Sequence, residues 1–289
     1  MAEPNLFHVD VFATQPLSGN GLTVFLGTEH WTPGLMLHLT QEMRQFESIF
    51  LSEVSTRGAT ARVFTVEEEL PFAGHPVLGA AAVLHRTRAP DAQAHSWTLS
   101  LPHGKVAVRT RRLDGHHHCE MNQGRAARGA AVSVPALLAV LSRLGLGPAD
   151  LIAGPDAQVL STGLPYLIVP VHPAALARAQ ITATDLEAQL LTLGAKFVLL
   201  LSCAEAEMRT WDNLGQVEDV ATGSAAGPAA EYLWAQGFAR ADAPLTIAQG
   251  RFAGRPSQIT VVRDSQQHLL VSGAVWPVSH GFLEVDRTS

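Results

Sequence analysis

The sequence predicts an α+β fold made of two homologous halves, each a curved, mainly antiparallel sheet wrapped around a central helix. Three pairs of segments recur in the same order, at offsets close to half the chain length. Two helix-like stretches are apolar almost all round, and a helix of this kind is normally enclosed on all sides. The strand-like runs alternate apolar and polar residues, as half-buried strands do.

The repeated segments predict where the chain divides. We expect an N-terminal lobe over residues 1–127 and a C-terminal lobe over residues 128–289, joined through the Gly/Ala/Arg-rich stretch 123–134. A final strand from residues 279–289 could complete the first lobe. The matched pairs are GLTVF from Gly21 with GLPYL from Gly163, LSLPHGKVA around Gly104 with LTIAQGRFA around Gly250, and GHPVLGAAAVL from Gly74 with GSAAGPAAEYL from Gly223.

Alternation and β-branched residues predict the strands, and a proline at the first turn marks several helices. The first half is expected to contain strands Leu6–Phe12, Leu22–Leu26, Ser48–Val54, Ala61–Val66, Trp97–Leu101 and Lys105–Thr110, with helices Pro33–Gln45 and Pro76–His85. The second half is expected to contain strands near Tyr166–Val171, Phe197–Leu201, Leu245–Ala248, Gln258–Val262 and His268–Val275, with helices Pro135–Leu144, Ala183–Leu193 and Ala225–Gln236.

Composition excludes several classes of protein. Hydrophobic residues make up 47% and charged residues 16%, which excludes a disordered chain. Lys plus Arg number 20 against 26 Asp plus Glu, so a nucleic-acid partner is not expected. The N-terminus lacks a signal-peptide pattern, and the longest apolar run, Phe197–Leu201, is too short to span a membrane. Two cysteines make no disulfide framework, so a cytoplasmic location without a membrane partner is expected.

Both apolar helices are entered through a turn with glycine just before the first turn, at Gly74 and at Gly223. Helix N-termini present unpaired N–H groups and the positive end of a dipole. Two such termini facing each other across a cleft would hold an anion, most simply a substrate carboxylate. Spacing alone equally allows two well-capped helices without a ligand.

Two other patterns are weaker. His116 to Cys119 form a contiguous run, but adjacent strand residues point to opposite faces, so a polar hairpin tip is favoured and no metal site is expected. Ser224, His75 and Asp219 could form a hydrolytic triad, but residue 222 is Thr and the nucleophile-elbow pattern fails. Hydrolysis at Ser224 is therefore a minor alternative.

Long motifs in both halves resemble the PhzF-like phenazine-biosynthesis isomerase family, within the diaminopimelate epimerase-like fold superfamily. They follow one another over nearly the whole chain, and ELPFAGHP and the D-x-A-T-G-S-A core are the most specific. The stretches are VDVFATQPLSGNGLTVFL (9–26), EMRQFESIFL (42–51), ARVFTVEEELPFAGHPVLGAAAVLH (61–85), EDVATGSAAGPAAEYL (218–233) and QGRFAGRPSQITV (249–261).

The resemblance implies a homodimeric isomerase that works without metal or organic cofactor and moves a proton between carbons of a small cyclic carboxylate. The family's type substrate is trans-2,3-dihydro-3-hydroxyanthranilate, bound in a cleft between the halves. Carried over to this chain, the general acid/base is Glu47, and His75 and Asp219 act on polar substituents. Amides around Ser224 would hold the carboxylate; the substrate-binding residues are then Gly74, Gly223, Ser224 and Ala225.

The residue chemistry agrees with these roles and leaves purely structural roles open. Phe46, Ile49 and Phe50 would desolvate the Glu47 carboxyl and raise its pKa toward a useful range. His75 and Ser224 could equally be capping residues, and Asp219 a loop carboxylate near a helix start.

One half supplies a carboxylate and the other does not. The position equivalent to Glu47 is expected near residues 192–195 (TLGA), where no acid occurs, so a single base is favoured. Diaminopimelate epimerases use two cysteines beside these turns, and here Ala73 and Asp219–Ala221 supply none. An amino-acid epimerase or racemase, or a non-catalytic small-molecule-binding protein of the same fold, is the alternative.

Overall fold

The computed structural model describes residues 5–215 and 217–284, and their contacts divide the chain into two compact units. Unit 1 comprises residues 1–122 and 272–289, and unit 2 comprises residues 123–271. The lobe boundary expected at 127/128 thus falls inside unit 2. The chain re-enters unit 1 at residue 272, earlier than the expected 279, because one long strand runs through this point. Residues 285–289 of that expected strand lie outside the described residues.

In unit 1 a ring of strands closes on itself. Its strands are β1 (Leu6–Val11), β2 (Asn20–Leu26), β3 (Glu47–Ser52), β4 (Gly58–Thr65), β6 (Ala94–Leu101), β7 (Gly104–Arg112), β8 (His117–Asn122) and β16 (Leu269–Gly281). They neighbour one another in that order, and β16 also pairs antiparallel with β1, which closes the ring. The short β5 (Glu69–Leu70) pairs with β4. The C-terminal strand therefore completes the N-terminal unit.

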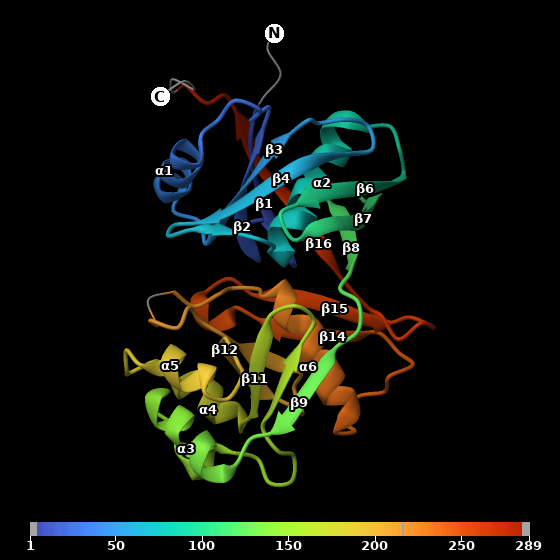
Figure 1. The fold of residues 1–289 in the computed structure, drawn as a ribbon. Coiled ribbons are helices and arrows are strands. Elements are labelled where there is room, and N and C mark those ends of the chain that lie inside the picture. The colour runs from blue at the N-terminus through green and yellow to red at the C-terminus, as the bar shows by residue number, and fades with distance from the viewer. Residues whose placement is uncertain (1–4, 216, 285–289) are drawn as a thin grey trace. The chain divides into compact units, whose positions relative to one another are not determined.

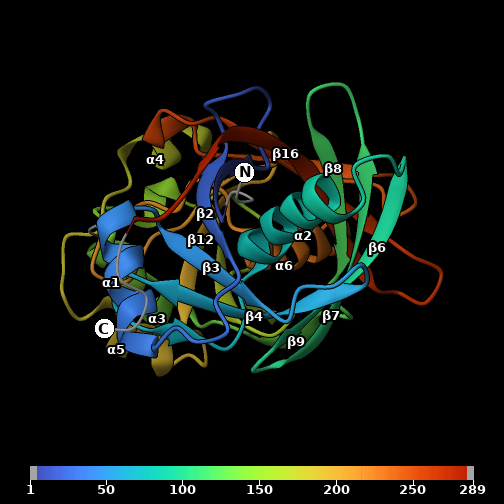
Figure 2. The same cartoon turned by 90° about the horizontal axis from the view of Figure 1, so that it is seen from above.

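The ring encloses α2 (Gly74–Arg88), the central helix of unit 1 (Figure 2). Every residue from Gly74 to His85 is buried, and the helix contacts β1, β2, β3, β4, β6, β7 and β8. The run of Gly and Ala in this helix lets strands approach from all sides. A second helix, α1 (Pro33–Met43), packs against β3 and β4 beside the stacked rings of Phe25 and Phe50.

Unit 2 repeats this plan around α6 (Gly223–Ala235), which contacts β10, β11, β14 and β15 (Figure 1). Its strands are β9 (Ala127–Ala131), β10 (Gln158–Ser161), β11 (Pro165–Pro170), β12 (Phe197–Ser202), β13 (Glu207–Arg209), β14 (Leu245–Gln249) and β15 (Ser257–Arg263). The sheet order is β15-β14-β13-β12-β11-β10-β9. Residues of α3 (Val134–Arg143), α4 (Pro173–Arg178) and α5 (Leu186–Leu191) form one apolar cluster with β10, β11 and β12.

Strand directions show that the two units share one topology. The β2/β3 pair and the β11/β12 pair are both parallel, and each is followed by an antiparallel pair, β3/β4 and β12/β13. The pairs that bracket the central helices, β4/β6 and β13/β14, are again parallel. The predicted fold class, two similar halves that each wrap a sheet around a central helix, is confirmed.

Some expected elements need correction. The stretch 123–134 is not a plain linker, because Ala127–Ala131 pair with β10 as strand β9. The helix expected at Ala183–Leu193 is only Leu186–Leu191, and helix α4 and strand β13 were not expected. His117 to Cys119 lie on strand β8 and not at a hairpin tip, which covers Asp114–His116. Strands β9 and β13, of five and three residues, show few alternations, and helices α4 and α5, of six residues each, are too short for a clear helical period.

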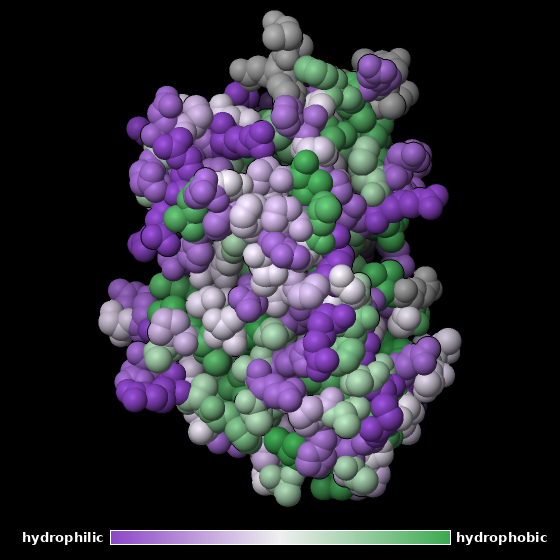
Figure 3. Space-filling model, turned by 180° about the vertical axis from the view of Figure 1, so that it is seen from behind, coloured by the Kyte–Doolittle hydropathy of each residue, from purple (hydrophilic) through white to green (hydrophobic). Residues whose placement is uncertain are grey.

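Within the described part of the chain, no helix is long and apolar enough to cross a membrane. Figure 3 shows hydrophilic and hydrophobic residues interspersed on one face of the molecule. The same part of the chain contains no group of three or more His, Cys, Asp or Glu residues placed to hold a metal ion.

The enclosure of α2 leads to a stability prediction. A Cβ added at Gly79 would lie 2.3 Å from Leu22 Cδ2 and 3.1 Å from Val11 Cγ2. We expect Gly79→Ala to lower the free energy of unfolding by about 1–3 kcal/mol, because overpacking outweighs the helix propensity of alanine. Urea denaturation measures this change.

The matched control is Gly34→Ala in the exposed first turn of α1, where the added Cβ would meet only Thr32 Oγ1 at 3.9 Å. That variant should be neutral or more stable by up to about 1 kcal/mol. Equal effects of the two substitutions would show that packing around α2 is not tight.

Candidate functional site

Glu47 is the first residue of β3 and the first of a row of side chains that faces the central helix of unit 1. Along β3, Glu47, Ile49 and Leu51 share one face, and Ser48 and Phe50 share the other. Phe50 packs in the aromatic cluster beside α1, so the Glu47 row faces α2. Glu47 is only 5% exposed. The carboxyl group is thus held inside unit 1 by strand alternation.

His75, the second residue of α2, meets this carboxyl group. Its Nδ1 lies 3.2 Å from Glu47 Oε2, and the side chain is buried. Burial lowers the pKa of His75 from 6.5 to about 3, so the imidazole is neutral near pH 7. The contact is therefore a hydrogen bond with a neutral ring and not a salt bridge.

Asn20 also approaches the His75 ring. Its Nδ2 atom lies 3.4 Å from the same Nδ1. A neutral ring nitrogen has either one N–H or one lone pair, so Nδ1 makes one good hydrogen bond at a time, and its shorter contact is the one to Glu47 Oε2. When Glu47 is ionised, Nδ1–H donates to the carboxylate. When Glu47 is protonated, its O–H can donate to Nδ1 or Nδ1–H can keep donating to a carboxyl oxygen. Both protonation states of Glu47 thus find a partner in His75.

The other ring nitrogen of His75 is left open. Nε2 is buried and has no hydrogen-bond partner among the residues that the structure describes. A buried polar atom without a partner costs free energy, and such atoms in native proteins are commonly reserved for a ligand.

In unit 2, Asp219 belongs to a compact polar network just before α6. Its Oδ2 accepts from Thr222 Oγ1 at 2.6 Å, and its Oδ1 accepts from the Ala221 N–H at 3.4 Å. Gln249, at the end of β14, donates from Nε2 to the Asp219 carbonyl and to Thr222 Oγ1. Gln249 Oε1 accepts the Thr222 N–H at 2.9 Å. The Gln249 side chain thereby orients the Thr222 hydroxyl toward the Asp219 carboxylate.

The start of α6 places the remaining residues expected to bind substrate in unit 2. Gly223 and Ser224 are its first two residues, as Gly74 and His75 are of α2. The Ala225 N–H already donates to the Thr222 carbonyl at 3.1 Å, so its amide is not available to a ligand. The set of candidate amides in unit 2 is therefore Gly223 and Ser224.

Ser224 does not act as a side-chain cap of its helix. No side-chain capping bond forms at the start of α6, where Thr222 is the N-cap residue, and Ser224 Oγ instead lies 2.7 Å from the Tyr166 hydroxyl. In unit 1, His75 likewise does not cap α2, whose N-cap residue is Ala73. The capping roles considered from the sequence are thus not those the structure shows.

The counterpart of Glu47 in unit 2 is Phe197. Each is the first residue of the strand that runs parallel to its predecessor, β3 beside β2 and β12 beside β11. The expected position near residues 192–195 was displaced, because the connection before β12 differs in length from that before β3. No carboxylate occupies the corrected position, and the matched N-cap residues Ala73 and Thr222 carry no thiol.

Four polar residues of these two clusters were missed from the sequence: Asn20, Tyr166, Thr222 and Gln249. Each lies in or next to a motif that was noticed, namely GNG, GLPYL, ATGSA and LTIAQG. The available signal was a polar residue in or next to a repeated or family motif. The hydrogen-bond partner of each such residue could not be predicted without the fold.

The Gln249 network gives a second stability prediction. Gln249→Leu should lower the free energy of unfolding by about 2–4 kcal/mol, since it leaves buried donors and acceptors of Asp219 and Thr222 unpaired. Chemical denaturation measures the change. Gln158→Leu is the control, because Gln158 makes a more exposed bond to the Gly129 carbonyl and should cost under about 1 kcal/mol. Similar losses for both variants would contradict the importance of the network.

The depressed pKa of His75 predicts a pH dependence of stability. Below pH 6.5 the unfolded chain binds a proton at His75, but the folded chain does not until about pH 3. The stabilisation is complete above pH 6.5 and is lost as the pH falls toward 3. Between pH 7 and 5, wild type should lose about 2 kcal/mol more than His75→Gln in urea denaturation. Equal losses would mean that His75 titrates normally.

Comparisons with known proteins agree with the fold. The family model described as phenazine biosynthesis-like protein matches residues 9–281. The trans-2,3-dihydro-3-hydroxyanthranilate isomerase of Pseudomonas fluorescens is 31% identical over 266 residues, which cover 88% of each chain.

Solved structures show the same architecture. A protein of Pseudomonas aeruginosa described as a predicted epimerase is 45% identical, with a TM-score of 0.93 over 98% of this chain and 100% of that one. A PhzF family protein of Bacillus anthracis, 20% identical, has a TM-score of 0.81 over 99% of this chain and 100% of its own, which shows the shared fold. Because the family model matches residues 9–281 and the relatives are isomerases, the chain belongs to the phenazine biosynthesis-like family and is a PhzF-like isomerase.

Proposed function

We propose that this isomerase moves a proton between two carbons of a small cyclic carboxylate, of the trans-2,3-dihydro-3-hydroxyanthranilate type, without a metal or organic cofactor. The observation that carries the proposal is the buried Glu47 carboxyl at 3.2 Å from the neutral His75 ring. The substrate class rests on the printed activity of the Pseudomonas fluorescens relative.

In the proposed reaction Glu47 is the general acid/base. Its carboxylate removes a proton from carbon, and the electron pair of the broken C–H bond moves into the conjugated system of the ring. The resulting Glu47 carboxylic acid returns the proton to another carbon on the same face, so nothing is oxidised or reduced. His75 supports both states, because Nδ1–H can donate to the Glu47 carboxylate and the ring can stay hydrogen-bonded to the carboxylic acid.

The proposal gives the remaining residues binding roles. His75, through the buried Nε2, and Asp219 act on polar substituents of the substrate. The Gly223 and Ser224 amides bind the carboxylate, which suits the positive end of α6, and Gly74 gives α2 the same kind of start. We also propose that the enzyme acts as a homodimer in the cytoplasm.

Epimerisation by two bases is the competing function, and one relative is described as a predicted epimerase. It would require an ionisable group in the second unit to match Glu47. Phe197 occupies that position, and Ala73 and Thr222 stand at the helix N-caps. These residues favour proton return by Glu47 itself.

Replacing the carboxyl group tests the proposal. Glu47→Gln keeps the shape of the side chain but cannot exchange a proton, so turnover of trans-2,3-dihydro-3-hydroxyanthranilate should fall at least about 1000-fold. Substrate binding should change by less than about tenfold. In heavy water, wild type should place solvent deuterium on the product carbon that receives the proton, and the variant should not.

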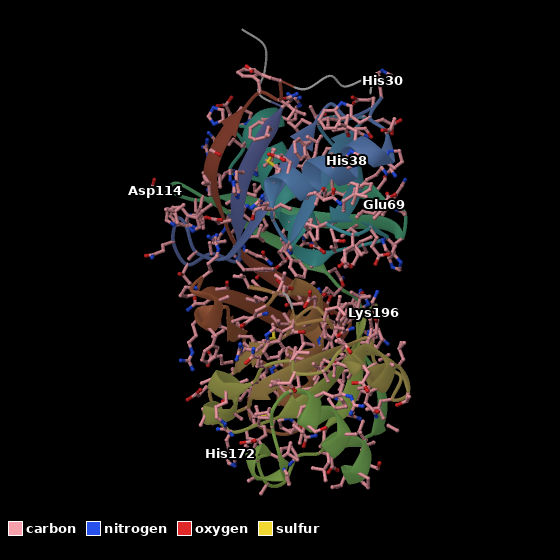
Figure 4. All side chains as sticks on the ribbon, turned by 90° about the vertical axis from the view of Figure 1, so that its left-hand side faces the viewer. His30, His38, Glu69, Asp114, His172 and Lys196 are labelled. Carbon is pink, nitrogen blue, oxygen red and sulfur yellow. The ribbon has the colours of Figure 1, made fainter. Side chains whose placement is uncertain are left out.

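The control is Glu69→Gln, which removes a surface carboxylate paired with Arg62 on β4 (Figure 4). Its turnover should equal that of wild type. Wild-type turnover by Glu47→Gln would overturn the assignment of the base. Formation of a pair of stereoisomers, with solvent deuterium at the inverted carbon only, would instead support epimerisation.

A further inference from the structure

Tyr166 brings a buried phenol to the start of the central helix of unit 2. It is the second residue of β11 and is 2% exposed, and its hydroxyl lies 2.7 Å from Ser224 Oγ. Ser224 itself is half-buried. Along β11, Leu167 and Val169 belong to the apolar cluster with α3 to α5, so Tyr166 faces the opposite side, toward α6.

The shared topology of the units shows which residues of unit 1 correspond to Tyr166 and Ser224. Ser224 and His75 are both second residues of the central helix. Tyr166 is the register partner of Phe197, as Leu22 is of Glu47. Unit 2 therefore has an apolar ring where unit 1 has its carboxyl, and a phenol where unit 1 has a leucine. The polar partner of the second helix residue thus lies on β11 in unit 2, one strand away from the position that Glu47 has in unit 1. It is a phenol, which ionises far less readily than a carboxyl group.

Acidity decides the direction of the Tyr166–Ser224 hydrogen bond. A phenol, with an ordinary pKa of about 10, is a far stronger acid than an aliphatic alcohol and is the better donor of the two. The pair allows either hydroxyl to donate. With the more acidic phenol as the donor, Ser224 Oγ accepts and the Ser224 hydroxyl can donate its own proton elsewhere. A Ser224 hydroxyl fixed in this way serves a ligand atom that accepts hydrogen bonds.

We propose that Tyr166 is a positioning residue that fixes Ser224 as a hydrogen-bond donor to the substrate carboxylate. This inference rests on the proposed function, which places that carboxylate at the Gly223 and Ser224 amides. One positive charge lies in the surroundings: the ammonium of Lys196 (Figure 4) lies 5.5 Å from the centre of the Phe197 ring, and that ring stacks on Tyr166. Phe197 takes the position of Glu47 in this unit, so strand β12 adds no carboxylate there, and the Asp219 carboxylate is held by Thr222.

Tyr166→Phe removes the hydroxyl but keeps the ring that stacks on Phe197. With trans-2,3-dihydro-3-hydroxyanthranilate, KM should rise about tenfold and kcat should change less than about threefold, since a binding contact is lost and not the base. Ser224→Ala should show the same split. The double variant should be no worse than Ser224→Ala, because Tyr166 acts through Ser224.

Tyr232→Phe is the matched control. Tyr232 is the other tyrosine of the chain, is fully buried on α6 and donates to the Asp156 carbonyl. It should leave both KM and kcat at wild-type values, while the free energy of unfolding falls because a buried hydrogen bond is lost. A KM for Tyr166→Phe within twofold of wild type, or an equal rise for Tyr232→Phe, would overturn the proposal.

Binding of two probes separates this inference from the proposed reaction. Anthranilate and aniline differ only in the carboxylate, and calorimetry measures their affinities without turnover. Wild type should bind anthranilate more tightly, and Tyr166→Phe should lose about tenfold for anthranilate and nothing for aniline. If the isomerisation is not observed but this pattern holds, the proposed reaction fails and the role of Tyr166 stands. If wild type does not discriminate between the probes, the carboxylate assignment is wrong.

Discussion

Each unit depends on the burial of a central helix that is rich in Gly and Ala and has almost no polar face. Because α2 carries Gly and Ala where strands approach, the sheet can close around it, and α6 is packed in the same manner. A helix held this way cannot shift along its axis without opening the sheet. Its first residues are therefore fixed against the strand residues beside them, and His75 meets Glu47 as Ser224 meets Tyr166. The polar contacts follow from the apolar packing.

The same scaffold carries different chemistry in its two copies. In unit 1 a buried carboxyl group contacts a neutral imidazole ring, and Asn20 lies beside that ring. In unit 2 the corresponding residues are an aromatic ring and two hydroxyls, with a separate network that holds Asp219 through Thr222 and Gln249. The two units share the strand directions and the helix starts, and they differ in the side chains at three matched positions.

The sequence predicted the repeated plan because its signals were strong: two helices without a polar face and three pairs of matching segments. It also placed Glu47 and His75 as candidates that the fold brings into contact. It failed at β9 and β13, where too few residues alternate, and it could not show that the Ala225 amide donates to the Thr222 carbonyl. It overlooked Gln249 and Tyr166 because their importance lies in bonds to distant residues, and pairing of this kind is decided by register.

The return of the C-terminal strand has a consequence for synthesis on the ribosome. Strand β1 finds its second neighbour only in residues 275–281. The first unit to be translated thus keeps an open edge until residues 275–281 have been synthesised, whereas unit 2 is formed by the contiguous residues 123–271. The nascent N-terminal sheet is the part of this protein most exposed to mispairing and to chaperone capture.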